Sequence, residues 1–99
     1  MPAALYTPSS DSFVGTARLT DIGLGGAMIE TSVPVLRRVP YELRWEWRGQ
    51  AMKATGRVAW EKAGGNAHRY GLSLATTSEQ ERLIRRMIDD LRQQLWSGK

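Results

Sequence analysis

Large apolar side chains alternate with charged ones over residues 41–48, which is the clearest pattern in the chain. The apolar positions are Tyr41, Leu43, Trp45 and Trp47, and the charged positions between them are Glu42, Arg44, Glu46 and Arg48. Because successive side chains of a β-strand point to opposite faces, this period of two predicts an antiparallel strand with one buried face. Gly49 and Gln50 then predict a two-residue hairpin, in which the glycine supplies the positive φ of a type II′ turn.

Four further stretches show the same period of two and predict strands at residues 13–19, 27–31, 51–62 and 67–75. The side chains expected on one face of the two longest strands are Met52, Ala54, Val58 and Trp60 in the first, and His68, Tyr70, Leu72 and Leu74 in the second. Glycine-rich segments at 21–26 and 64–66 predict turns between strands. The first eleven residues, which are rich in proline and serine, are predicted to form a loose N-terminal segment.

The hydrophobic period changes to that of a helix near residue 78. Ser78 and Glu81 have the spacing of a capping box, in which a hydroxyl accepts from the third helical N–H and a Glu side chain reaches back. An apolar stripe follows at helical spacing, and its members are Leu83, Ile84, Met87, Ile88, Leu91 and Leu95. The pattern predicts a helix that ends near Trp96 and packs this stripe on the strands.

A small antiparallel sheet of five or six strands has exposed edges unless it closes on itself. We therefore predict an all-β fold with one C-terminal helix, in which residues 12–97 form a small antiparallel barrel covered at its mouth or flank by the helix. The expected core includes Trp45, Val58, Leu72 and Leu74. A length of 99 residues suits one such domain.

The composition argues against most catalytic chemistry. The chain has no cysteine and one histidine, His68, so we expect no metal site and assign no catalytic residue. There is no apolar run long enough to cross a bilayer and no signal-peptide pattern, so the expected location is the cytoplasm and no membrane partner is expected. We interpret the chain as a binding or regulatory module without a cofactor, and not as an enzyme.

Positive charge is concentrated in the middle of the chain. Residues 35–60 contain six Lys or Arg and two Glu, a surplus of four that equals the formal net charge of +4. Such a surface attracts nucleic acid, nucleotides or an acidic protein, or consists simply of solvated strand faces. One hypothesis is therefore a small basic nucleic-acid-binding barrel, although the chain lacks a dense basic cluster with interleaved exposed aromatic side chains.

The segment around the first glycine-rich turn reads RLTDIGLGGAMIE. It resembles the second motif, (D/N)xSxxG, of the PilZ family of bacterial cyclic di-GMP receptor domains. Asp21 and Gly26 match the first and last positions, and Gly23 stands where the family has serine. Further similarities follow in order: a hairpin, GRVAW at 56–60, RYGLSL at 69–74 and a helix opened by SEQE. The resemblance covers roughly residues 13–96 and implies a PilZ-type β-barrel.

The resemblance also implies a ligand site. In the family an arginine motif, RxxxR, lies just before the barrel and clamps the phosphates and guanines of cyclic di-GMP, since a guanidinium fork matches both acceptor sets. The second motif contacts the ligand or shapes the turn beneath it, which makes Asp21, Gly23 and Gly26 the ligand-binding positions. Asp21 is equally suited to capping its own turn through backbone N–H groups.

No arginine or lysine precedes Arg18, and the family spacing would place the arginine motif at or before Met1. Arg18, Arg37 and Arg38 are the auxiliary basic residues that remain. We therefore expect a PilZ-like regulatory module in bacterial second-messenger signalling that acts through a protein partner and binds cyclic di-GMP weakly or not at all. The alternative is a functional cyclic di-GMP receptor whose arginine motif lies upstream of the given chain.

Overall fold

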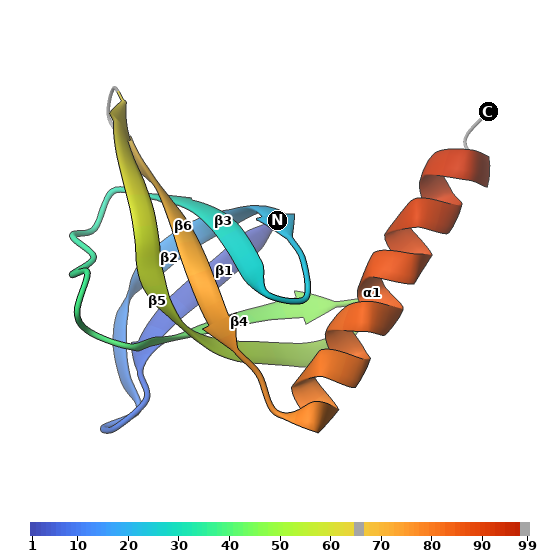
Figure 1. The fold of residues 1–99 in the computed structure, drawn as a ribbon, viewed down its shortest axis with the longest axis horizontal. Coiled ribbons are helices and arrows are strands. Elements are labelled where there is room, and N and C mark those ends of the chain that lie inside the picture. Colours follow the sequence, from blue (N-terminus) through green and yellow to red (C-terminus); the bar gives the residue numbers. More distant parts are fainter. Residues whose placement is uncertain (65–66, 98–99) are drawn as a thin grey trace.

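The computed structural model describes residues 1–64 and 67–97, with the backbone alone for residues 94–97. Within these residues, six strands precede one helix (Figure 1). The strands are β1 (Pro2–Thr7), β2 (Ser12–Ile22), β3 (Gly26–Thr31), β4 (Tyr41–Trp47), β5 (Gln50–Gly64) and β6 (Ala67–Ala75), and the helix is α1 (Ser78–Ser97). The predicted turn at 64–66 and the side chain of Leu95 lie outside the described residues.

The six strands form one closed antiparallel barrel in the order β1-β2-β3-β6-β5-β4. Closure is completed where β1 pairs with β4, with Leu5 opposite Leu43. Each strand therefore has a neighbour on both sides over at least part of its length, which removes the exposed edges of an open sheet. The predicted all-β fold with one C-terminal helix is confirmed.

The prediction that the first eleven residues are loose was wrong for the segment that forms β1. Ala3 and Leu5 face the core and are 9% and 0% exposed. Pro2 is the first residue of the strand and Pro8 lies in the following turn, so neither proline removes an N–H from the middle of a ladder. The prolines indicated loose structure, whereas they only mark the two ends of a short strand.

The barrel core is formed by inward-facing side chains of all six strands and by two helix residues. The largest fully buried side chains are Leu5, Ile29, Leu43, Ile84 and Met87. Of the four predicted core residues, Trp45, Val58 and Leu72 are buried, and Leu74 is partly buried against the same cluster. The indole N–H of Trp45 donates to Sδ of Met87 over 3.3 Å, and this contact joins β4 to the helix.

Trp60 does not lie on the inward face with Val58 as the alternation predicted. The register between β5 and β6 shifts between Val58 and Trp60, so Ala59 is an extra residue and the side chains beyond it change faces. Trp60 is consequently 41% exposed on the outside of the barrel. His68 is also exposed, near the tip of the β5–β6 ribbon, which projects beyond the other strands in Figure 1.

Two local predictions were wrong by one residue. Trp47 pairs with Gln50, so the hairpin loop is Arg48–Gly49, and both residues have positive φ, 49° and 78°. Two positive values make a type I′ turn, whose twist matches that of the strands, in place of the predicted type II′ turn. At the helix start, Gln80 N donates to Thr77 Oγ1 over 3.1 Å and Thr77 N donates to Gln80 Oε1 over 3.0 Å.

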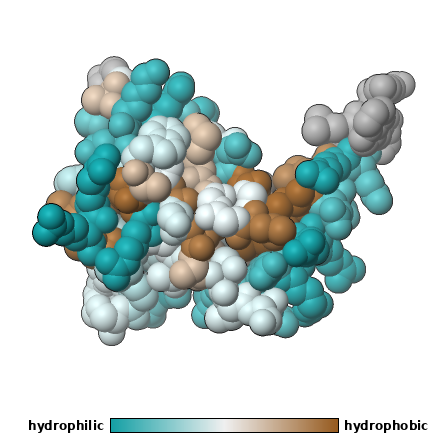
Figure 2. Space-filling view, viewed as in Figure 1, coloured by the Kyte–Doolittle hydropathy of each residue, from teal (hydrophilic) through white to brown (hydrophobic). Residues whose placement is uncertain are grey.

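The capping box is therefore formed by Thr77 and Gln80, and Ser78 is already helical. From there the helix packs on the barrel mainly through Ile84 and Met87, which are 1% and 0% exposed. The rest of the stripe, Leu83, Ile88 and Leu91, is only partly buried. Figure 1 shows the second half of α1 standing away from the barrel, and in Figure 2 hydrophobic surface gathers in the crevice between them.

Candidate functional site

Asp21 lies at the end of β2, directly after a bulge. Leu19 pairs with Ile29 and Asp21 with Met28, so Thr20 is the extra residue. The carboxylate is exposed, and its Oδ1 accepts from the backbone N–H of Ile22 over 2.9 Å. Asp21 thus stabilises the backbone of its own turn, as one of the two sequence hypotheses proposed, and it does so from the outer surface of the barrel.

The turn between β2 and β3 is fixed to the neighbouring strand. Gly23 N donates to Gly26 O over 2.8 Å, and Leu74 N donates to Gly25 O over 3.0 Å. A Cβ at Gly26 would approach Leu72 O to 3.2 Å, which favours glycine there. A Cβ at Gly23 would meet only Gly26 O at 3.7 Å, so the backbone leaves room for the serine of the family motif.

Asp21 belongs to a row of side chains that crosses four strands on the outer face. The pairing registers place Asp21 opposite Met28, Met28 opposite Gly71, and Gly71 opposite Trp60. The indole ring of Trp60 lies directly over Gly71, where any Cβ would overlap it. These residues line a hollow of about 210 Å³ that also includes Gly26. The row thus combines a carboxylate with an exposed aromatic face, a surface suited to a nucleobase.

The adjacent row on the same face is charged. Its members, in register across β2, β3, β6 and β5, are Arg18, Glu30, Arg69 and Lys62. Arg18 and Arg69 share the single carboxylate of Glu30, with N–O distances of 3.3 and 3.7 Å. A second hollow, of about 340 Å³, lies between Glu30, Lys62 and Arg69. Three cations and one carboxylate therefore border the row that contains Asp21 and Trp60.

The three auxiliary arginines are not brought together. Arg18 lies in the charged row. Arg37 pairs with Glu61 at 3.9 Å, and Glu61 follows Trp60 in the strand, so its side chain leaves from the opposite face. Arg38 follows in the loop between β3 and β4, where its carbonyl accepts from Arg57 over 3.3 Å. Of the three, only Arg18 is placed to take part in the site at Asp21.

Sequence reasoning missed the aromatic half of this site. Trp60 was placed on the same strand face as Val58 because a bulge is not visible in the alternation, and Gly71 was not singled out. A glycine in the middle of a strand is a signal of close approach by another group, and here that group is the indole. Lys62 and Arg69 were missed because only the strand order places them beside Arg18.

The described residues contain no group of three or more His, Cys, Asp or Glu side chains that could hold a metal ion. In the same part of the chain, no helix has the length and apolar character needed to cross a membrane.

Comparison with known proteins gives two matches. The family model described as PilZ domain matches residues 3–90. Among solved structures, the crystal structure of the PilZ domain of CeSA from a cellulose-synthesizing bacterium superposes with a TM-score of 0.70, over 93% of this chain and 92% of that chain. The two sequences are 21% identical, so this likeness concerns the fold. No curated protein matches the chain.

Proposed function

This chain belongs to the PilZ domain family, and on that premise we propose that it is a regulatory module that acts through a protein partner and binds cyclic di-GMP weakly or not at all. Membership of the family places the chain in cyclic di-GMP-related signalling, among domains that bind and regulate. The finer statement concerns what its own outer face offers to a ligand with two guanines and two phosphates.

The face with Asp21 and Trp60 supplies the groups that a guanine needs. The carboxylate of Asp21 can accept from guanine N–H donors, and the exposed indole of Trp60 offers a stacking surface next to it. Met28 and Gly71 lie between them in the register, and Gly26 borders the same hollow. This half of a nucleotide site supports the family's ligand chemistry at the positions that the motif indicated.

The same face offers few free cationic groups for the phosphates, and this observation carries the proposal. Arg18 and Arg69, the two arginines of the charged row, both contact Glu30, so a phosphate must compete with a carboxylate for each of them. No arginine or lysine lies between Met1 and Ala17. A hydrogen bond to a charged group contributes about 1.5–3 kcal/mol. Without two such arginines, binding weakens by roughly two to four decades at about 1.4 kcal/mol per decade.

The test is calorimetric titration of cyclic di-GMP into the chain and into a version with RxxxR joined ahead of Met1. The geometry favours this graft: Leu19 N donates to Met1 O over 2.7 Å, and the amino group of Met1 donates to Leu19 O over 3.2 Å. Added residues therefore leave the barrel two positions from Asp21, and Met1 and Asp21 border one hollow. We expect little heat from the unmodified chain and clear binding by the graft.

The matched control carries SxxxS in place of RxxxR, and a second control combines the arginine graft with Asp21→Ala. Both should bind much more weakly than the arginine graft. Sub-micromolar binding by the unmodified chain would contradict the proposal and favour a functional receptor. An arginine graft that binds no better than its serine control would show that the missing arginines are not the cause of weak binding.

A further inference from the structure

A groove separates α1 from the β4–β5 hairpin. It consists of two hollows of about 480 and 330 Å³, both of which have Met52 and Leu83 in their walls. Trp45 lines the first hollow and Met87 the second, and the two side chains are joined by the 3.3 Å contact from the indole N–H to sulfur. Methionine side chains are flexible and polarizable, so a floor of this kind adapts to varied apolar side chains.

Trp47 in the wall of this groove has an unused hydrogen-bond donor. Its Nε1 is buried and has no acceptor within the described residues. Buried polar atoms are nearly always paired in native structures, so each exception calls for an explanation. An acceptor atom of a chain bound in the groove would satisfy this N–H.

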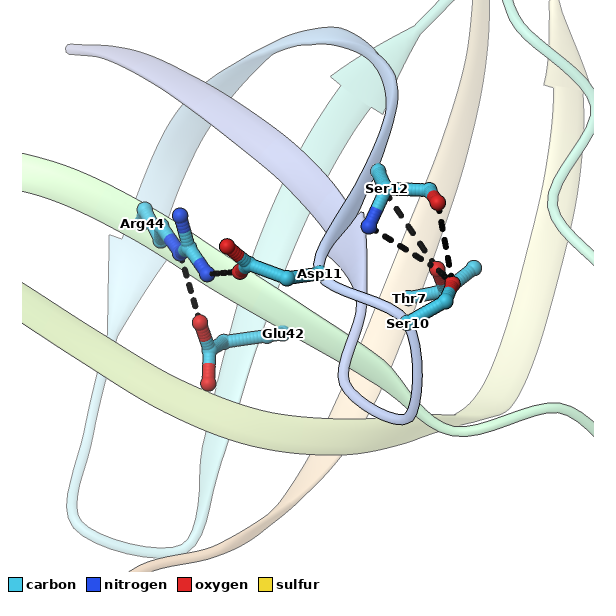
Figure 3. Close-up of polar contacts among 6 residues, drawn as sticks. All are labelled: Thr7, Ser10, Asp11, Ser12, Glu42 and Arg44. Atoms are coloured by element: carbon cyan, nitrogen blue, oxygen red, sulfur yellow. Dashed lines mark hydrogen bonds and ion pairs between the residues drawn. The ribbon is translucent and has the colours of Figure 1, made fainter.

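Arg44 at one end of the groove is already committed to the barrel itself. It contacts Asp11 and donates from Nε to Glu42 over 2.5 Å (Figure 3). Both hydrogen bonds raise the pKa of Arg44, and the one to Glu42 has the larger effect. The turn that carries Asp11 is tied by hydroxyl contacts of 2.7 Å between Thr7 and Ser10 and 2.9 Å between Ser10 and Ser12. Arg44 is thus a fixed part of the rim.

Two other cations of the rim lack such partners. Lys53 and Arg86 are exposed and have no ion pair within the described residues, whereas Arg48 contacts Asp90 at 3.7 Å. Lys53 also lies directly opposite Arg44 in the β4–β5 register. Like charges in directly opposed positions destabilise a sheet. The carboxylates that line the two hollows, Glu79 and Asp90, are paired with Arg82 and Arg48. Lys53 and Arg86 are therefore the rim cations without an ion pair within the described residues.

We propose that this groove binds a short segment of a partner protein in which acidic and apolar side chains are combined. The inference rests on the proposed function, because it names the surface through which the module would act on its partner. Apolar side chains of the segment pack on the partly buried Leu83, above the buried Met52 and Met87. Its carboxylates face Lys53 and Arg86, and a carbonyl or carboxylate oxygen accepts from Trp47. None of the groove residues lines the hollow at Asp21 and Trp60.

The probe is a capped synthetic peptide in which Glu and Leu alternate, titrated into the ¹⁵N-labelled chain. Peptides that alternate Lys with Leu, or Glu with Ser, are the controls for charge and for apolar contact. We expect the Glu–Leu peptide to shift the indole N–H signal of Trp47 and the backbone signals of Leu83, and to leave the indole signal of Trp60 in place. The two control peptides should bind at least about tenfold more weakly, a difference of about 1.4 kcal/mol.

Variants test the contacts one at a time. Lys53→Glu combined with Arg86→Glu should weaken the Glu–Leu peptide by roughly tenfold or more, a loss of about 1.4 kcal/mol or more. The matched pair Arg57→Glu and Lys62→Glu makes the same charge change on the other face and should leave binding unchanged. Trp47→Phe keeps a ring but removes the donor, and it should weaken binding several-fold. Circular dichroism checks that each variant is folded.

The proposal is overturned if the Glu–Leu and Lys–Leu peptides bind equally, if no peptide binds, or if the shifts map to Trp60. Light scattering provides the remaining discrimination: if the chain dimerises and the same groove signals shift with protein concentration, a second copy occupies the groove. Failure here leaves the cyclic di-GMP titrations intact, since those depend on the other face.

Discussion

Replacing Gly71 by alanine is expected to drive the indole of Trp60 off the surface of β6. A Cβ at Gly71 would overlap Nε1, Cε2 and Cδ1 of that ring. The backbone at this position lies between β3 and β5 in the barrel and has little freedom to move. The side chain of Trp60 is on the outside and can rotate into solvent, so we expect the ring to move and the backbone to stay in place.

The cost follows from the packing that is lost. Trp60 is 41% exposed, so somewhat more than half of its surface is covered. A fully buried aromatic side chain removes roughly 150–250 Å² from water, so the covered part of Trp60 is about 100–150 Å². At about 25 cal/mol per Å², reduced for a compact unfolded state, this is worth about 2–3 kcal/mol. Alanine in place of glycine returns about 0.5–1 kcal/mol, which leaves a net loss of roughly 1–2 kcal/mol.

Denaturant unfolding followed by circular dichroism measures this loss in two backgrounds. In the parent chain Gly71→Ala should lower the free energy of unfolding by the amount given. In a Trp60→Ala background the same change should be neutral or slightly stabilising, because the clash is gone. Gly64→Ala is the matched control, since its Cβ would meet no atom within 4 Å. An equal loss in both backgrounds would refute the argument that the ring is what the methyl group displaces.

Two further pairs of substitutions test the helix. Ile84→Asp places a carboxylate at a position that is 1% exposed and should lower the free energy of unfolding by several kcal/mol, enough to unfold the domain. Leu91→Asp at a half-buried position should lower it clearly less. Equal losses in thermal unfolding would mean that the second half of α1 packs as tightly as the first. Thr77→Ala removes the hydroxyl that accepts from Gln80 and should cost about 1 kcal/mol. Ser78→Ala should change stability by only a few tenths of a kcal/mol, and the reverse order would restore the capping box predicted from the sequence.

The sequence predicted five of the six strands within the described residues, and it missed β1. Residues 67–75 were predicted as a strand and form one with those bounds, because large apolar and polar side chains alternate there without a break. β1 was missed because it begins at Pro2 and is followed by Pro8, and both prolines were interpreted as signs of loose structure. The hairpin type was missed because Arg48 takes a positive φ that its side chain does not favour, and only the register with Gln50 requires it.

Some residues of the candidate site could be predicted from the sequence and others could not. Asp21 and Gly26 could be named from a motif, because both lie within one turn and need no knowledge of pairing. Their role in binding cyclic di-GMP stays a prediction. Trp60, Gly71 and Arg69 come from strands far along the chain, and they join Asp21 only through the registers of β3, β5 and β6. A single shifted pair decides that Trp60 faces outward, and alternation alone does not reveal such a shift.

The closure of the barrel by β1 also determines when the domain can fold. Ala3 pairs with Ala17 on one side and with Trp45 on the other, and Ile29 pairs with Tyr70. The first strand to leave the ribosome therefore waits for a partner made some forty residues later, and Met87, made later still, completes the core. Pairing such distant residues closes long loops, and the entropic cost of closure arises before the contacts of the pairing offset it. Folding is therefore expected in the millisecond-to-second range typical of non-local β-topologies, after nearly all of the barrel and helix has been synthesised.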